Sequence, residues 1–119
     1  MRAVSFIVIA GLLCTAAPAL GQPAPSEFEA AAGEYAACMI ATVRMGMTTK
    51  MDPPAFRAGL DKSCKAEEAR FRAAAVKQAL ALGRTEAEAA AEIEGNIARG
   101  KAIWAEDQAS YVRTGKVPR

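Results

Sequence analysis

Cys38 and Cys64 are the residues whose type and spacing most clearly predict a covalent link in this chain. Each lies 13 residues from Met51, where the chain is expected to reverse direction between two helices. Residues equally far from the turn of an antiparallel helical hairpin face one another, so the two Cα atoms can approach to the roughly 5.5 Å that a disulfide requires. The spacing is too wide for the C-x-x-C arrangement of a reactive dithiol. We therefore predict a structural disulfide between Cys38 and Cys64.

Three methionines, Met45, Met47 and Met51, surround the same expected turn. Their thioether sulfurs are soft ligands that could bind Cu(I). Methionine is also a flexible filler of protein cores, and helical spacing places Met45 on the buried stripe of the first helix. A further interpretation groups Met47, Met51 and Phe56 into a small exposed patch that binds a partner chain. The sequence leaves these interpretations open and favours core packing.

The chain has no histidine, and this restricts both its metal chemistry and its catalytic chemistry. A structural zinc site needs four ligands, usually cysteine and histidine, so we expect no metal site of this kind and no cofactor. Ser-His and Cys-His nucleophiles are excluded, as is the commonest general base. The carboxylate pairs Glu67-Glu68 and Glu88 with Glu92 fall among basic residues on helix faces that should be solvated. We expect no catalytic residue and a protein that is not an enzyme.

Residues 1–21 have the layout of a secretory signal peptide, with Arg2, an apolar run and then small residues before Gln22. Cleavage before Gln22, or alternatively after Ala19, would remove Cys14 with the signal, and an uncleaved N-terminal anchor is the other interpretation. Removing 21 of the 119 residues leaves 98, with 14 basic and 13 acidic side chains. We expect a periplasmic or secreted protein without a membrane anchor, and its near-neutral charge does not favour nucleic acid as a partner.

Capping signals and helical periodicity predict three helices separated by short turns. Ser26 followed by Glu29, and Thr85 followed by Glu88, each fit a capping box at the start of a helix. Asp52, directly before a proline, is the corresponding signal for the middle helix. The helices are expected over residues 27–47, 53–82 and 86–113, between a disordered leader at 22–26 and a frayed tail at 114–119.

Large apolar residues recur at helical spacing, and no strand-like alternation is present. The expected inner stripes are Phe28, Tyr35, Cys38, Met39 and Met45; Phe56, Leu60, Cys64, Phe71 and Leu82; and Ile93, Ile97, Trp104 and Tyr111. The pairs Asp61→Lys65 and Glu68→Arg72 are expected on the solvated side of the second helix. The fold class is therefore all-α, a small antiparallel three-helix bundle (a helical hairpin plus a third helix) with one disulfide.

The core expected from these stripes is thin, because alanine inflates the apolar content of 52%. A covalent staple or a bound partner would help such a small chain to stay folded. With catalysis and nucleic-acid binding disfavoured, the remaining expectation is a non-enzymatic envelope protein that binds another protein or a peptide. Cu(I) binding by Met45, Met47 and Met51 is the alternative.

Overall fold

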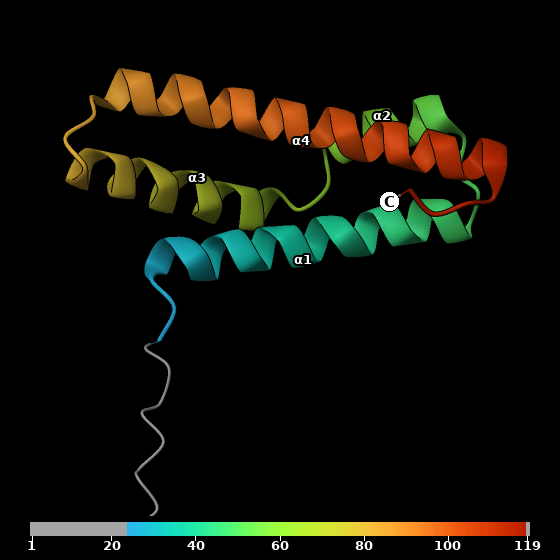
Figure 1. Ribbon diagram of the computed structural model, residues 1–119, viewed down its shortest axis with the longest axis horizontal. Coiled ribbons are helices and arrows are strands. Elements are labelled where there is room, and N and C mark those ends of the chain that lie inside the picture. The colour runs from blue at the N-terminus through green and yellow to red at the C-terminus, as the bar shows by residue number, and fades with distance from the viewer. Residues whose placement is uncertain (1–23, 119) are drawn as a thin grey trace, which may run out of the picture.

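The computed structural model describes residues 24–118, and the regular structure within this range is all helical. Four helices follow one another: α1 (Glu27–Thr48), α2 (Pro53–Leu60), α3 (Lys65–Ala81) and α4 (Glu86–Thr114). In Figure 1, α1 and α4 are the two long helices, and the shorter α3 and α2 lie alongside successive parts of α4. The all-α class is confirmed. The expected signal peptide lies outside the described residues.

The helix expected over residues 53–82 is interrupted, and this is the main departure from the three-helix prediction. Residues 61–64 form a turn in which the Ser63 hydroxyl donates to the carbonyl of Gly59 at 3.0 Å. Side-chain bonds of this kind offer the backbone an alternative to the helix. Cys64 then takes a left-handed conformation with a φ of 55°. A right-handed helix cannot continue through that conformation, so α2 and α3 are separate helices.

The helix ends follow the capping signals of the sequence. The Ser26 N–H donates to the Glu29 carboxylate at 2.7 Å, and the Glu29 N–H donates to the Ser26 hydroxyl at 3.1 Å. Thr85 and Glu88 exchange the same two bonds at 3.2 Å each. Gly83 follows the last residues of α3 with a φ of 83°, the conformation that favours glycine after a helix. The ends of α1 and α4 lie within one residue of the predicted ones.

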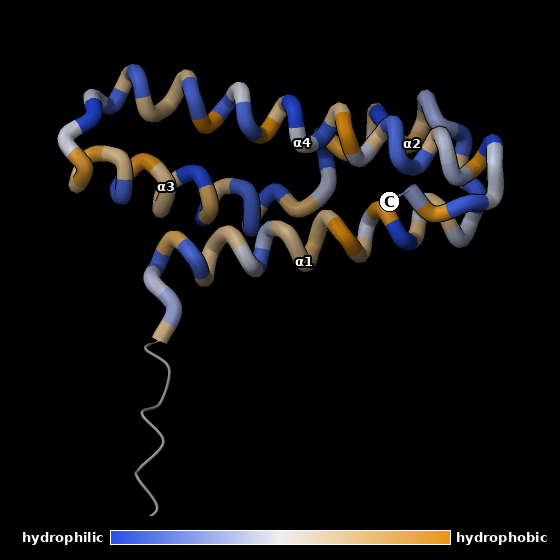
Figure 2. Tube along the Cα trace, in the orientation of Figure 1, coloured by the Kyte–Doolittle hydropathy of each residue, from blue (hydrophilic) through white to orange (hydrophobic). Residues whose placement is uncertain are grey.

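The helices pack in two groups that share α4. α3 packs on α1 and α4, while α2 packs on α4, and α1 also contacts α4. Phe71 of α3 packs against both core clusters. One cluster consists of Tyr35, Met39, Val43, Phe56, Leu60 and Ala105, and the other of Ala75, Ala89, Ile93 and Ile97. Figure 2 shows apolar and polar positions mixed along every helix, as expected for helices with one buried side.

Two large apolar residues that were expected on inner stripes are exposed instead. Met45 is 63% exposed, because it lies two positions beyond Val43 and therefore almost opposite to it on the helix. The buried stripe of α1 continues through Gly46 and not through Met45. Leu82 is 76% exposed because it is the C-cap of α3 and follows the last helical residue, past the part of the helix in which Ala75 is buried.

The turn after α1 is closed by a tight contact among three elements. A Cβ atom at Gly46 would lie 2.5 Å from two ring carbons of Phe56. Gln108 of α4 is fully buried, and its amide nitrogen donates to the carbonyls of Gly46 at 3.2 Å and Met51 at 2.7 Å. Phe56 is itself a core residue, 3% exposed. The prediction that Phe56 forms an exposed patch with Met47 and Met51 is therefore wrong.

Candidate functional site

A disulfide joins Cys38 of α1 to Cys64 at the start of α3, which confirms the pairing predicted from the sequence. The two Cα atoms are 6.0 Å apart. Cys64 is the N-cap of α3, and its side chain makes no capping hydrogen bond. The Thr42 hydroxyl lies 3.7 Å from the Cys64 sulfur and donates to the Cys38 carbonyl at 3.0 Å. The disulfide thus fixes α1 to the turn at which the expected second helix is interrupted.

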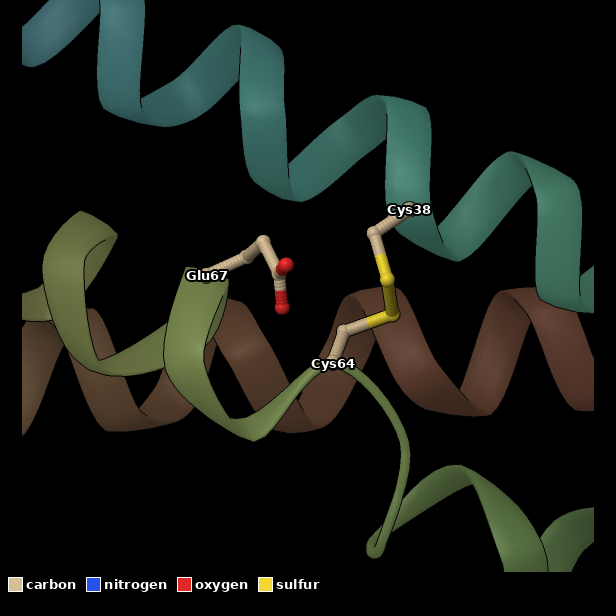
Figure 3. A group of neighbouring side chains, drawn as sticks. All are labelled: Cys38, Cys64 and Glu67. Carbon is tan, nitrogen blue, oxygen red and sulfur yellow. A yellow bond between two sulfur atoms is a disulfide. The ribbon is translucent and has the colours of Figure 1, made fainter.

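Glu67 adds a carboxylate beside the disulfide. One of its oxygens and the two sulfur atoms of Cys38 and Cys64 all lie within 4.8 Å of one another. Figure 3 shows the carboxylate and the disulfide in the same space between α1 and α3. All three residues are half-buried. Glu67 follows Cys64 by three positions, and this spacing is the sequence signal that places both side chains at the first turn of α3.

Glu68, the next residue, is buried at 4% exposure. One of its carboxylate oxygens accepts hydrogen bonds from the Lys101 ammonium at 2.8 Å and the Tyr35 hydroxyl at 3.2 Å. The other oxygen accepts from Arg72 at 3.0 Å. The expectation that Glu68 lies on a solvated helix face is therefore wrong. Asp61 pairs with Lys101 at 3.6 Å because the turn after α2 brings it to α4 and not to its i+4 neighbour.

The contacts of Glu68 shift two pKa values. Burial by itself raises the pKa of Glu68, but the hydrogen bonds from Lys101 and Arg72 outweigh this effect and lower the pKa below its ordinary value. Burial, together with the negative charge of Glu68, raises the pKa of Tyr35 to about 12. At neutral pH Glu68 is therefore ionised and Tyr35 is neutral. A carboxylate that stays ionised in this way is poorly suited to act as a general acid.

Four aromatic side chains from three helices form a continuous series. The ring of Phe71 packs against Phe28 at a centroid distance of 5.8 Å and stacks on Tyr35 at 5.5 Å. Tyr35 in turn meets Trp104 of α4 edge-on at 6.2 Å. Tyr35 therefore belongs both to this series and, through its hydroxyl, to the ionic contacts of Glu68. The aromatic series therefore connects α1, α3 and α4.

Two adjoining hollows beside the aromatic series form a groove, which we define by their lining residues. The hollows share Phe71 and Asn96. The first, of about 210 Å³, has an apolar lining of Phe28, Phe71, Ala75, Ala79, Leu82, Ala89 and Ile93 and a polar lining of Gln78, Arg84, Glu92 and Asn96. The second, of about 230 Å³, is lined by Ala32, Tyr35, Phe71, Asn96, Ile97, Gly100 and Trp104. No charged residue lines the second hollow within the part of the chain that the structure describes, so this hollow is suited to apolar groups. The ion pair of Arg84 and Glu92 gives the first hollow a charged border.

The three methionines considered as Cu(I) ligands do not lie on one side of α1. Met45 is exposed, whereas Met47 is half-buried and packs against the core. Because these residues are two positions apart in a helix, their side chains point in nearly opposite directions. Met51 follows the helix and is 39% exposed.

Comparisons of the chain with known proteins found no relative. No protein-family model matches the chain, and no curated protein or solved structure matches it. Within residues 24–118, none of the helices combines the length and the apolar character needed to cross a bilayer. The interpretation of the groove and of the cysteine pair therefore rests on the geometry of these residues.

Proposed function

We propose that this protein is an exported, non-enzymatic domain that binds an amphipathic helix of another protein along the groove. The observation that carries the proposal is the pair of adjoining, mainly apolar hollows around Phe71. Concave, mainly apolar surfaces with few polar groups are typical of binding sites. Ile103, which is 60% exposed, lies one helical turn beyond Gly100 of the second hollow and extends the apolar surface beside it.

The spacing of the hollows favours a helix as the bound segment. The α4 residues that line the first hollow run from Ala89 to Asn96, and those that line the second run from Asn96 to Trp104. The centres of these two stretches are about seven residues, or roughly 10 Å, apart along the axis of α4. A helix lying alongside α4 would place its side chains i and i+7 at this separation, which is the usual pattern of anchors in a helix bound in a groove.

Export is supported by the disulfide and by the N-terminal sequence. Disulfides persist in oxidising compartments such as the periplasm and are rare in the cytosol. Residues 1–21 have the pattern of a cleaved signal peptide. We therefore place the mature domain in the periplasm or outside the cell, with an envelope protein or peptide as its partner.

A binding role is favoured over catalysis and over Cu(I) binding because of the surroundings of Glu68 and of the methionines. The buried carboxylate of Glu68 is occupied by Lys101, Arg72 and Tyr35, which leaves it unavailable as an acid or base. Cu(I) binding by the methionines would require Met45 and Met47 to converge, although α1 directs them apart.

Trp104 provides a direct test, because it is the only tryptophan of the chain and lines the second hollow. The oxidised protein is titrated with an amphipathic helical peptide that carries leucines at positions i, i+4 and i+7, while tryptophan fluorescence is recorded. We expect a saturable change with a dissociation constant of about 1–100 μM. A peptide of the same composition in shuffled order should bind at least about tenfold more weakly, because its leucines no longer share one face.

Replacing either of two alanines of α1 by glutamate locates the binding site. Ala32→Glu places a carboxylate in the second hollow and should weaken peptide binding at least about tenfold, because a charge would be buried against apolar groups. Ala37→Glu, at an exposed position of the same helix, is the matched control and should bind as the wild type does. Equal affinities for the two variants, or for the ordered and shuffled peptides, would exclude this groove as the site.

A further inference from the structure

The disulfide and Glu67 together contain three groups that bind metals once the sulfur–sulfur bond is broken. The sulfurs of Cys38 and Cys64 and a carboxylate oxygen of Glu67 lie within 4.8 Å of one another, and all three residues are half-buried (Figure 3). We propose that reduction of the disulfide creates a site in which the two thiolates and this carboxylate bind a thiophilic divalent cation, of which Zn²⁺ is the probe.

The distances required by such a site are within reach of small side-chain movements. Tetrahedral zinc has Zn–S bonds of about 2.3 Å and Zn–O bonds of about 2.1 Å, which place the two sulfurs about 3.8 Å apart and each sulfur about 3.6 Å from the oxygen. The sulfurs of a disulfide, about 2 Å apart, must therefore separate by nearly 2 Å. The Cα atoms of Cys38 and Cys64 are 6.0 Å apart, so rotation of the two side chains supplies this movement while the helices stay in place. The carboxylate oxygen of Glu67, which lies within 4.8 Å of both sulfurs, must approach each of them by at most about 1 Å.

The ligand set leaves the fourth tetrahedral position for water, which is the arrangement of an open zinc site. The Thr42 hydroxyl lies 3.7 Å from the Cys64 sulfur and donates its proton to the Cys38 carbonyl, so it adjoins the site without being one of its ligands. Cys64 is also the N-cap of α3, where the unpaired N–H groups of the helix favour a negative charge. Arg70 lies 3.9 Å from Glu67 and 3.3 Å from Glu34, and it can keep the second contact when Glu67 turns toward a metal.

The chemistry balances with a dithiol as the reductant. The dithiol transfers two electrons and two protons to the protein disulfide, so two protein thiols and one oxidised reductant disulfide are formed. Zn²⁺ binding then displaces the two thiol protons, and the carboxylate joins as an anion. The disulfide and the metal therefore exclude one another. This inference goes beyond the groove proposal and does not depend on it.

The test is a Zn²⁺ titration of the protein before and after reduction by excess dithiol, with the reductant removed without air. Competition with a chromophoric chelator should show one Zn²⁺ bound per reduced chain with a dissociation constant below about 1 μM, and up to two protons should be released per metal. The oxidised protein should not bind at this level. Equal binding by the oxidised protein, or none by the reduced protein, would overturn the proposal.

Three variants distinguish the proposed metal ligands from a neighbouring residue that is not a ligand. Cys38→Ser/Cys64→Ser should abolish binding, and Glu67→Gln should weaken it at least about tenfold. Glu34→Gln, which removes the other carboxylate paired with Arg70, is the matched control and should bind as the wild type does. If Glu67→Gln binds as tightly as Glu34→Gln, the carboxylate is not a ligand and the site as proposed is wrong.

Circular dichroism of each sample keeps the test decisive if reduction loosens the fold. A reduced chain that stays helical should bind Zn²⁺ with little change in its spectrum. A reduced chain that loses helix should regain it when Zn²⁺ is added, because metal binding is then coupled to folding. Helix that does not return, together with no bound metal, would refute the site.

Discussion

Replacing Glu68 and Lys101, singly and together, measures what the buried ion pair contributes to stability. The Lys101 ammonium lies 2.8 Å from the Glu68 carboxylate, a separation at which the attraction is about 6 kcal/mol for an effective dielectric constant of 20. Loss of hydration on burial opposes most of this attraction. The pair as a whole is therefore nearly neutral for stability, whereas removal of one partner leaves the other buried without its counter-charge.

The single variants Glu68→Met and Lys101→Met should each lower the free energy of unfolding by about 3 kcal/mol, near the lower limit for breaking a buried pair. The lower limit applies because other partners remain, namely Arg72 for Glu68 and Asp61 for Lys101. The double variant should lose less than about 2 kcal/mol. Its main cost is the Tyr35 hydroxyl, which is left without its acceptor and costs about 1–3 kcal/mol, while the new apolar contacts stabilise the fold.

Urea unfolding of the oxidised proteins at pH 7, followed by circular dichroism, gives the four free energies of this cycle. We expect a coupling energy of at least about 4 kcal/mol between Glu68 and Lys101, the amount by which the two single losses together exceed the loss in the double variant. The matched control is Lys77→Met, because Lys77 forms an exposed pair with Glu27 at 2.6 Å and should change stability by less than about 1 kcal/mol. Single variants as mild as this control, with additive effects, would refute the burial argument.

Three further outcomes are expected. The folded-state pKa of Glu68 lies below its unfolded value of about 4.3. The contribution of the ionised carboxylate to stability is therefore complete above the unfolded pKa and is lost as the pH falls toward the folded pKa. Urea midpoints should accordingly fall more steeply on acidification for the wild type than for Glu68→Gln. Gly46→Ala should destabilise by about 1–3 kcal/mol through overpacking, whereas the uncrowded Gly33→Ala should stabilise by about 0.5–1 kcal/mol in thermal melts. Cys38→Ala/Cys64→Ala should lower the urea-derived free energy of unfolding by about 3.5 kcal/mol for a separation of 26 residues.

The parts of the fold that could be predicted from the sequence are those set by local chemistry. Ser26, Thr85 and Asp52 start helices because their side chains accept bonds from backbone N–H groups a few residues later. Gly83 ends a helix because it takes a positive φ without strain. The disulfide could be predicted as well, but for a partly wrong reason. The pairing follows from one continuous second helix, whereas Cys64 in fact directly precedes α3, which is the helix that packs on α1.

The interruption at residues 61–64 and the burial of Glu68 depend on tertiary contacts, so local signals could not settle them. Asp61 and Ser63 are weak helix formers, but such residues are common inside helices. The charge of Glu68 predicts a solvated position, although this residue lies three residues before Phe71 and thus on the apolar side of the helix. Its burial is tolerated because Lys101 and Tyr35, from two other helices, and Arg72 donate hydrogen bonds to its carboxylate.

The groove could not be foreseen, because it exists only where three helices meet. Its residues are mostly alanine, glycine and aromatic side chains that pattern reasoning assigns to a packed core. The small residues leave space beside Phe71 and Trp104 only when α1, α3 and α4 have their final separations. Periodicity identifies the inner face of a helix but does not say whether that face is filled.

The hydrogen bonds of Gln108 make the first turn of the fold depend on its last helix. The partners of Gln108, the carbonyls of Gly46 and Met51, precede it by 62 and 57 residues. Until α4 is in place, the turn after α1 therefore lacks the residue that closes it, and α2 lacks the helix on which it packs. The two cysteines lie on either side of this region, one in α1 and one directly before α3. Their covalent bond thus closes a loop whose own conformation is completed by a helix outside it.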